Sequence, residues 1–289
     1  MNTLPNLFLF AAPRSGSTQL SAWLSSHPDI ALPPIKEPNY FAREDFPPPD
    51  DPQLQRLLDV TNPLSPRARG NFALLSTIAD YASLYDPIAN TRWRLDASTS
   101  YLASTSAAAE IARTCPDARI ITLTRDPVAR AISHYGLARR TGRTRASLTS
   151  EIATERAHSG PPILRYLLRP SQQTAALARL RAVFPPERCL HIQFDTLITA
   201  PGSTLLCIAR FLGIAPQGFD RSRIARNASA LPRCPPLAHL LHRAGWHAPL
   251  RHALPPAAKA ALRPLWFRNA TPAISPQEHA MLTQLLEGA

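Results

Sequence analysis

An apolar run that leads directly into a glycine-containing polar turn is the feature that most constrains the fold of this chain. Residues 7–11 read Leu-Phe-Leu-Phe-Ala, which is typical of a strand buried on both faces of a parallel sheet. The hexapeptide Pro13-Arg14-Ser15-Gly16-Ser17-Thr18 follows, and then a helical pattern with apolar residues at Leu20, Trp23 and Leu24. The segment is therefore predicted to form a strand, a tight loop and a helix.

The rest of the chain repeats this alternation. Further strands are predicted at residues 118–124 and 190–194, where apolar and β-branched residues cluster. Helical patterns separate or follow them; they lie at residues 76–84, 104–113, 126–135, 174–184 and 205–212. Strands that alternate with helices indicate an α/β fold with a central, mostly parallel sheet flanked by helices. We expect one P-loop-like domain over residues 1–289, with inserted loops at about 42–94 and 139–162.

The hexapeptide has the chemistry of an anion-binding loop. Backbone N–H groups and the dipole at a helix start attract negative charge, and Gly16 lets the backbone approach a phosphate closely. Arg14 adds a cation, while Ser17 and Thr18 add hydroxyl donors. The common nucleotide-binding loop, G-x-x-x-x-G-K-[ST], has a lysine where this chain has Ser17. A P-loop nucleotide kinase stays open as an alternative, although this chain lacks the lysine that such a kinase would need. A structural turn without a ligand is a second alternative.

A second polar motif follows the strand at 118–124. Arg125 comes directly after this strand, at the carboxyl end where open parallel sheets bind ligands. Ser133 lies eight residues further on, about two turns along the predicted helix. The two side chains could therefore hold one phosphate. The alternative is an Arg125–Asp126 pair at a helix start with an exposed serine.

The chain is strongly basic, with a formal net charge of +12. Lys36 and Lys259 are its only lysines, so arginine accounts for nearly all of the positive charge. This bias has two interpretations, a preference for arginine in composition or an anionic partner. The absence of any run of five Lys or Arg residues argues against nucleic acid, although a basic, non-enzymatic nucleic-acid-binding protein stays open as an alternative.

Cysteine spacing and hydropathy set the remaining expectations. The four cysteines form no C-x-x-C pair, which predicts neither a metal site nor a dithiol motif. No apolar stretch reaches 18 residues and the N-terminus lacks the features of a signal peptide. We therefore expect a cytoplasmic, bacterial protein without a membrane span. The sequence carries no signal for its oligomeric state.

The two polar motifs, in this order and spacing, resemble those of the sulfotransferases that use 3′-phosphoadenosine 5′-phosphosulfate (PAPS). The hexapeptide resembles their 5′-phosphosulfate loop, and residues 121–135 resemble their 3′-phosphate segment. Further similarity is found at residues 27–30, 35–41, 96–102, 194–197 and 211–213. The pattern is closest to bacterial members related to the carbohydrate and heparan sulfate enzymes. The resemblance implies transfer of a sulfuryl group from PAPS to a hydroxyl or amine acceptor, with no metal required.

The resemblance also implies roles for individual residues. The 5′ phosphosulfate would be held by Arg14, Ser15, Gly16, Ser17 and Thr18, and the 3′ phosphate by Arg125 and Ser133. Arg14 would in addition stabilise charge on the leaving oxygen. Residues 227–229 and Pro232-Arg233 resemble the cofactor lid, which makes Arg233 a candidate for a second contact with the 3′ phosphate.

Glu37, within Lys36-Glu37-Pro38, is the candidate general base of the resembled family. An acceptor hydroxyl must lose its proton as it attacks sulfur, which a carboxylate can assist. The alternative for Glu37 is a surface carboxylate paired with Lys36 or Arg43. His134 is interpreted as a packing residue and is the next candidate if Glu37 is not the base.

Some positions depart from the resembled pattern. Ala97 stands where carbohydrate sulfotransferases often have a lysine, and we expect Ser98 or a nearby arginine to substitute for it. Gln173 stands where tyrosine is frequent. The acceptor stays open among a sugar, a lipid, a polyketide, a phenol and a peptide tyrosine, with its contacts expected in residues 42–94 and 139–162. An inactive member of the fold is a further alternative.

Overall fold

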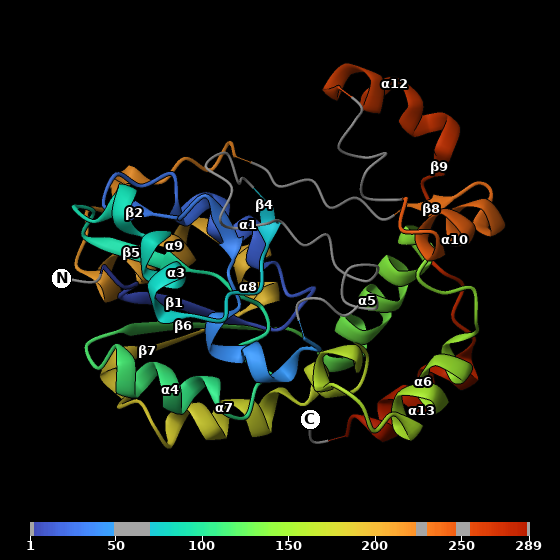
Figure 1. Ribbon diagram of the computed structural model, residues 1–289, viewed down its shortest axis with the longest axis horizontal. Helices are drawn as coiled ribbons and strands as arrows, with labels where there is room; N and C mark the ends of the chain where they lie inside the picture. The colour runs from blue at the N-terminus through green and yellow to red at the C-terminus, as the bar shows by residue number, and fades with distance from the viewer. Residues whose placement is uncertain (1–2, 49–69, 224–229, 247–254, 288–289) are drawn as a thin grey trace.

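A five-stranded parallel sheet forms the centre of the molecule (Figure 1). The computed structural model describes residues 3–48, 70–223, 230–246 and 255–287. The strand order is β2-β5-β1-β6-β7, and all pairings in this sheet are parallel. The strands are β1 (Leu7–Ala11), β2 (Ile30–Ala31), β5 (Trp93–Asp96), β6 (Arg119–Thr124) and β7 (Cys189–Gln193). The prediction of an α/β fold around a parallel sheet is confirmed.

Side chains of β1 alternate between two hydrophobic cores, one on each face of the sheet. Phe8 and Phe10 enter the first core, and Leu7, Leu9 and Ala11 enter the second. Helices α4 (Ala107–Thr114) and α7 (Gln173–Arg181) cover the first face, while α1 (Ser17–Leu24) and α9 (Pro201–Leu212) cover the second (Figure 1). Because both faces of β1 are buried, this strand lacks the polar alternation of a half-exposed strand.

A third hydrophobic cluster lies beyond the carboxyl ends of the strands. It packs α5 (Pro127–Thr141) and α6 (Leu148–Ala157) against α13 (Pro276–Leu285), through residues such as Tyr135, Ile152 and Leu282. Figure 1 shows these helices to the right of the sheet, where α5 faces the end of β1. The C-terminal helix thus returns to the edge of the sheet at which a ligand is expected.

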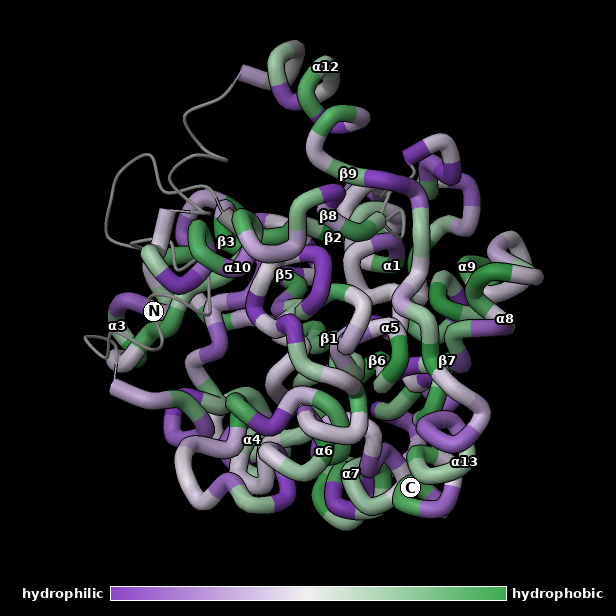
Figure 2. Tube along the Cα trace, turned by 90° about the vertical axis from the view of Figure 1, so that its right-hand side faces the viewer, coloured by the Kyte–Doolittle hydropathy of each residue, from purple (hydrophilic) through white to green (hydrophobic). Residues whose placement is uncertain are grey.

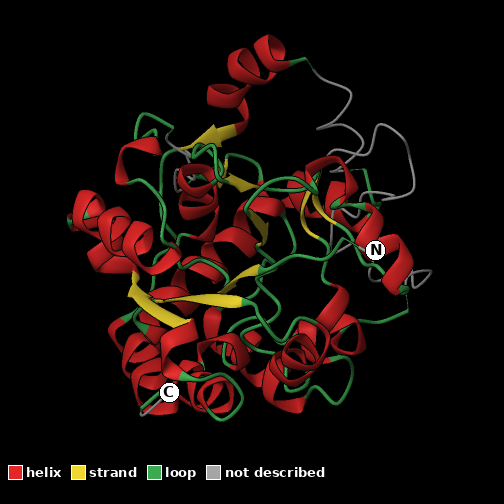
Figure 3. Cartoon of the chain, turned by 90° about the vertical axis from the view of Figure 1, so that its left-hand side faces the viewer, coloured by secondary structure: helices red, strands yellow, loops and turns green. Residues whose placement is uncertain are grey.

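Smaller elements complete the fold. β3 (Ile35–Glu37) pairs in parallel with β4 (Gly70–Phe72), and β8 (Leu231–Pro232) pairs antiparallel with β9 (Phe267–Arg268). The remaining α-helices are α3 (Ile78–Ser83), α8 (Phe194–Thr199), α10 (Pro235–Arg243) and α12 (Pro256–Trp266). A 3-10 helix, η1 (Tyr40–Asp45), follows β3. Helix α12 stands out from the body of the molecule (Figures 1 and 3).

Sequence patterns missed two strands of the central sheet, β2 and β5. β5 lies between β2 and β1, and its Trp93 and Leu95 are buried in the second core. Tyr81 and Tyr85, also within the stretch expected as an inserted loop, are fully buried in the first core. The described part of residues 42–94 therefore contributes core elements, and residues 49–69 lie outside the described part.

Candidate active site

The loop between β1 and α1 has the backbone geometry of an anion cradle. Gly16 immediately precedes α1 with φ 91°, and Arg14 has φ 74°, so both adopt the left-handed conformation. A Cβ atom at Gly16 would lie 3.0 Å from the Phe194 ring, so glycine is required for space as well as conformation. Ser15 is fully buried, and its hydroxyl has no hydrogen-bond partner among the described residues. A buried hydroxyl without a partner is costly, so this loop fits a ligand that accepts hydrogen bonds.

The two polar motifs meet in one pocket. Arg14 Nε donates to Ser133 Oγ at 3.2 Å, and Arg125 Nη1 donates to the carbonyl oxygen of Arg14 at 2.9 Å. The Arg125 guanidinium also lies 4.4 Å from the centre of the Phe194 ring. Arg14, Arg125 and Ser133 line a cavity of about 190 Å³. The structure thus brings together residues that the sequence assigned to opposite ends of one ligand.

The pocket carries an excess of positive charge. Arg140 of α5 lines it together with Arg14 and Arg125. Burial, followed by the charges of Arg140 and Arg125, lowers the pKa of Arg14 to about 10, so its guanidinium remains protonated at neutral pH. Burial also lowers the pKa of Arg125. The charged form of Arg14 is destabilised by Arg140 and Arg125, and an anion in the pocket would offset this, which makes the pocket suited to a phosphate group.

The C-terminal part of the chain covers this pocket. The pocket is also lined by Ala230, which precedes β8, and by Ala270, Thr271 and Pro272, which follow β9. Arg233 has an exposed side chain whose Nε donates to the carbonyl oxygen of Pro264 at 2.9 Å, and it does not line the pocket. The suggested lid residues 227–229 lie outside the described residues.

Gln173 holds the backbone of Arg125 in place, a role that the sequence did not reveal. Its side-chain Oε1 accepts from the Arg125 N–H at 3.0 Å, and its Nε2 donates to the Arg125 carbonyl oxygen at 2.7 Å. The Gln173 side chain is buried at the start of α7. Both backbone groups of the residue that follows β6 are thereby satisfied, which orients the guanidinium towards Arg14.

Arg130 is a second support that sequence patterns missed. It is fully buried, and its Nη1 donates to the Pro13 carbonyl oxygen at 3.2 Å and to His134 Nδ1 at 3.1 Å. Its other nitrogens bond the carbonyl oxygens of Tyr166 and Leu167 and the Ser171 hydroxyl. Arg130 therefore fastens the loop after β1 to residues 166–171 through α5.

His134 is kept neutral by this arrangement. Burial, and then the charges of Arg130 and Arg143, hold the pKa of His134 well below its usual value. Because arginine can only donate, His134 Nδ1 is the acceptor in its bond with Arg130. The packing interpretation of His134 therefore agrees with its surroundings.

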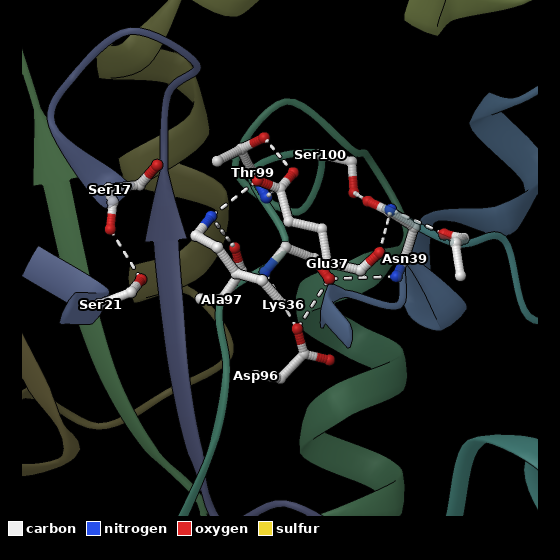
Figure 4. Close-up of polar contacts among 11 residues, drawn as sticks. Ser17, Ser21, Lys36, Glu37, Asn39, Asp96, Ala97, Thr99 and Ser100 are labelled. Atoms are coloured by element: carbon white, nitrogen blue, oxygen red, sulfur yellow. Dashed lines mark hydrogen bonds and ion pairs between the residues drawn. The ribbon is translucent and has the colours of Figure 1, made fainter. Parts of the chain in front are cut away.

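Glu37 lies in a second polar cluster, shown in Figure 4. Lys36 Nζ is 2.7 Å from Glu37 Oε1, and Thr99 Oγ1 donates to Glu37 Oε2 at 2.8 Å. The pair between Glu37 and Lys36 that the sequence allowed is therefore present. The alternative pair with Arg43 is not formed, because Arg43 pairs with Glu110 at 2.9 Å.

Lys36 lies beside Ala97, the position at which the resembled enzymes often have a lysine. Its Nζ donates to the Ala97 carbonyl oxygen at 3.3 Å. In Figure 4 the Lys36 side chain lies on the side of Glu37 that faces Ser17. The expected substitute, Ser98, is fully buried and donates to Asp96 Oδ1 at 2.7 Å, so its hydroxyl is committed to the core.

A buried carboxylate, Asp96, fixes the geometry of this cluster. It accepts hydrogen bonds from the hydroxyls of Tyr81 and Tyr101 at 2.7 and 2.8 Å, in addition to the bond from Ser98. Ser98 Oγ in turn accepts from the backbone N–H of Asn39 at 3.1 Å. Burial raises the pKa of Asp96, while its hydrogen bonds act in the opposite direction. This network joins the end of β5 to the segment that follows Glu37.

The described residues contain no group of three His, Cys, Asp or Glu side chains arranged to bind a metal ion. Among the helices in the described ranges, none is long and apolar enough to cross a membrane.

Comparison with known proteins identifies the family. A family model described as "Sulfotransferase family" matches residues 5–217, so the chain belongs to the sulfotransferase family. The chain is similar to the solved structure of a sulfotransferase from Alicyclobacillus acidocaldarius, with 27% identity, a TM-score of 0.63, and coverage of 86% of this chain and 96% of that one. It is also similar to the sulfotransferase domain of the Synechococcus PCC 7002 olefin synthase, with 20% identity, a TM-score of 0.47, and coverage of 98% and 94%. No curated protein matches the chain significantly.

Proposed function

We propose that this sulfotransferase uses PAPS as its donor and transfers the sulfuryl group to a hydroxyl or amine acceptor. The observation that carries the proposal is the pocket in which Arg14, from the loop after β1, meets Arg125 and Ser133, from the unit after β6. PAPS has phosphate groups at both its 5′ and 3′ positions, and this pocket joins two anion-binding elements. The loop lacks the lysine of a nucleotide kinase, which favours PAPS over ATP.

The donor would be held from both ends. Arg14, Gly16 and the loop hydroxyls of Ser15, Ser17 and Thr18 would surround the 5′ phosphosulfate at the start of α1. Arg125 and Ser133 would bind the 3′ phosphate. Arg233 has an exposed side chain outside the pocket wall, so its contact with the 3′ phosphate would require a change in the residues around β8. These contacts work by positioning and charge stabilisation, as in phosphoryl transfer.

The transfer itself would be a single in-line displacement. The acceptor oxygen or nitrogen forms a bond to sulfur while the bond between sulfur and the bridging oxygen breaks. The electron pair of that bond leaves with the 5′ phosphate, where Arg14 and the loop amides stabilise the charge. The products are the sulfated acceptor and 3′,5′-adenosine diphosphate (PAP).

Glu37 would receive the acceptor proton. Its Oε1 accepts from Lys36 and its Oε2 from Thr99, and a carboxylate oxygen can accept a second hydrogen bond. Lys36 would supply the positive charge that other family members place at the Ala97 position, because its Nζ already lies beside the Ala97 carbonyl oxygen. The buried Asp96 network would keep this cluster aligned.

The acceptor would approach from the side of η1. A small notch is lined by Asp45, Ser100, Pro162 and Arg165. Its residue Ser100 follows Thr99 in the chain, and Asp45 and Pro162 belong to the two stretches expected to face the acceptor, residues 42–94 and 139–162. The C-terminal segment lines the same pocket as Arg14, which supports the treatment of residues 1–289 as one functional domain.

An acceptor screen tests the proposed function. The protein is incubated with PAPS labelled with a heavy sulfur isotope and a panel of sugars, lipids, phenols, polyketide hydroxyacids and tyrosine peptides. Mass spectrometry then seeks the label on an acceptor. Transfer that depends on PAPS, and that is lost in Arg14→Gln, supports the proposal. Equal labelling by wild type and Arg14→Gln, or group transfer from ATP instead of PAPS, contradicts it.

A further inference from the structure

The C-terminal segment is basic in a way that the donor pocket does not explain. Residues 221–277 contain no Asp or Glu. They contain nine basic residues: Arg221, Arg223, Arg226, Arg233, Arg243, Arg251, Lys259, Arg263 and Arg268. Most of the net charge of +12 therefore comes from a fifth of the chain. Among these nine residues, those that the structure describes do not line the pocket around Arg14.

The same segment exposes large apolar side chains. The three most exposed among the described residues are Leu265 at 74%, and Leu240 and Trp246 at 63% each. Leu237 and Leu262 are also exposed. Exposed leucine and tryptophan that gather on one segment, rather than being scattered singly, mark an interaction surface.

The basic and apolar residues of α12 lie on adjoining faces of the helix, as in helices that bind at a membrane surface. On α12, Leu262, Leu265 and Trp266 have the spacing of one helical face, and Lys259 and Arg263 lie four residues apart on the adjoining face. Figure 2 shows hydrophobic and hydrophilic residues mixed along this helix, which stands clear of the body. An apolar face flanked by Lys and Arg is the pattern of helices that lie in a membrane surface.

Helix α10 also combines exposed leucines with an arginine. Leu237 and Leu240 are three residues apart, and Arg243 follows at the same interval. The β8–β9 pair links the two helices, and the Arg233 N–H donates to the carbonyl oxygen of Trp266 at 2.9 Å. The two helices are therefore held at the same end of the molecule (Figure 1). We call α10, Trp246 and α12 together the basic cap.

We propose that the basic cap docks on an anionic lipid surface. Leu240, Trp246 and Leu265 would enter the headgroup region, while Lys259, Arg263 and Arg243 would face the anionic headgroups. A second copy of the chain is disfavoured as the partner of the basic cap, because a symmetric contact would bring together two basic surfaces without acidic residues. Nucleic acid would use the charge but leave the exposed leucines unexplained. The proposal does not depend on the identity of the sulfuryl donor.

Docking here would place the donor pocket close to the lipid surface. Ala230 immediately precedes β8, Ala270 is separated from the end of β9 by Asn269, and both alanines line the pocket. The strands that hold the basic cap together thus lead directly into the pocket wall.

Vesicle binding tests the proposal with the full chain. Sedimentation is measured with phosphatidylcholine vesicles, with and without phosphatidylglycerol. We expect binding only when phosphatidylglycerol is present, and weaker binding as salt is raised. Tryptophan fluorescence should shift to the blue on binding. Trp23 and Trp93 are buried in the core, so the shift would report on Trp246 and Trp266.

Matched variants locate the surface. Leu265→Ser should reduce vesicle binding, whereas Ile198→Ser, at a position in α8 that is 51% exposed, should not. Lys259→Gln and Arg263→Gln should each lower the binding constant about fivefold, whereas Arg210→Gln on α9 should leave it unchanged. Three results would overturn the proposal: equal binding to vesicles without phosphatidylglycerol, binding insensitive to the cap variants, or a stable dimer in solution that Leu265→Ser dissociates. Tighter binding of duplex DNA than of anionic vesicles, lost in the same variants, would also overturn it.

Discussion

Arg14 Nε donates a hydrogen bond to Ser133 Oγ at 3.2 Å across 119 residues of sequence. The bond joins the loop after β1 to α5, and both side chains line the pocket that also contains Arg125. Each of the two elements could bind an anion alone. Together they bring the two elements that the sequence assigned to the two ends of one ligand into a single pocket.

The Arg14–Ser133 bond predicts energetic coupling in ligand binding. Arg14→Gln and Ser133→Ala should each weaken PAP binding, and the double variant should lose less than the sum of the two. Residues that share a hydrogen bond typically show coupling of about 0.5–3 kcal/mol. Isothermal titration calorimetry of the four proteins gives this value. Arg14→Gln combined with Arg210→Gln, far from the pocket, is the control pair and should be additive. Additivity within the Arg14–Ser133 pair would mean that the bond does not act on the ligand.

Arg125 is expected to discriminate ligands by their 3′ phosphate. A hydrogen bond to a charged group contributes about 1.5–3 kcal/mol. Arg125→Ala should therefore weaken PAP about 10- to 150-fold while the affinity for 5′-AMP, which lacks this phosphate, changes little. Competition binding with the two nucleotides measures the difference. Arg125 also donates to the carbonyl oxygen of Arg14, so an equal loss for both nucleotides would assign it to loop support alone.

Glu37→Gln tests the proton acceptor. The substitution keeps the size of the side chain and an oxygen that can accept from Thr99, but it removes the proton-accepting charge. Loss of a general base typically costs about 10²–10⁴ in rate, so kcat for a hydroxyl acceptor should fall by that factor. PAP affinity should stay near the wild-type value. An acceptor of low pKa, already partly ionised, should be affected much less.

The outcome also separates the two interpretations of Glu37. If Glu37 only pairs with Lys36, Glu37→Gln would lower stability modestly and leave kcat near the wild-type value. Lys36→Met is the matched variant. It removes the cation and leaves the carboxylate, so its pH profile should differ from that of Glu37→Gln if the carboxylate takes the proton.

His134 should make the protein less stable in mild acid. Its pKa in the folded protein is held well below the usual value by burial, Arg130 and Arg143, whereas in the unfolded chain it is about 6.5. Below pH 6.5 the unfolded state therefore binds a proton that the folded state does not. The free energy of unfolding should fall as pH drops from 6.5 towards the folded pKa, by at most about 1.4 kcal/mol per pH unit.

Urea denaturation between pH 7.5 and about 5 measures this slope. His134→Asn, which keeps a neutral acceptor near Arg130, should flatten it. His279→Gln, at an exposed position of α13, is the control and should not. An unchanged slope in His134→Asn would show that other groups, such as His191, account for the acid sensitivity.

Three strands of the central sheet and the meeting of Arg14 with Arg125 could be predicted from sequence, because their signals are local. β1 is a continuous apolar run and β6 and β7 are rich in apolar residues, and the structure places all three within one residue of the predicted bounds. Arg14 and Arg125 each follow such a strand. Parallel strands bring their carboxyl ends to one edge, so the meeting of the two arginines follows from the pattern.

The residues that hold the pocket in place, Gln173 and Arg130, could not be predicted from the sequence, because they act through contacts between distant parts of the chain. Gln173 bonds the backbone of Arg125 from 48 residues away, and Arg130 reaches the Pro13 carbonyl oxygen across 117 residues. Neither residue type signals such a role. β5 was missed because its four residues alternate apolar and charged side chains, and Asp96 is buried only through its bonds to Tyr81 and Tyr101.

The most direct test of a PAPS-dependent sulfotransferase is the comparison of two ligands by thermal denaturation. PAP at about a hundredfold excess over its dissociation constant should stabilise the protein by about 2.7 kcal/mol and raise Tm accordingly, whereas ATP with Mg²⁺ at the same concentration should raise Tm much less. The shift with PAP should be reduced in Arg125→Ala. Equal shifts with PAP and with ATP and Mg²⁺, or no shift with PAP, would contradict the assignment of the pocket to PAPS.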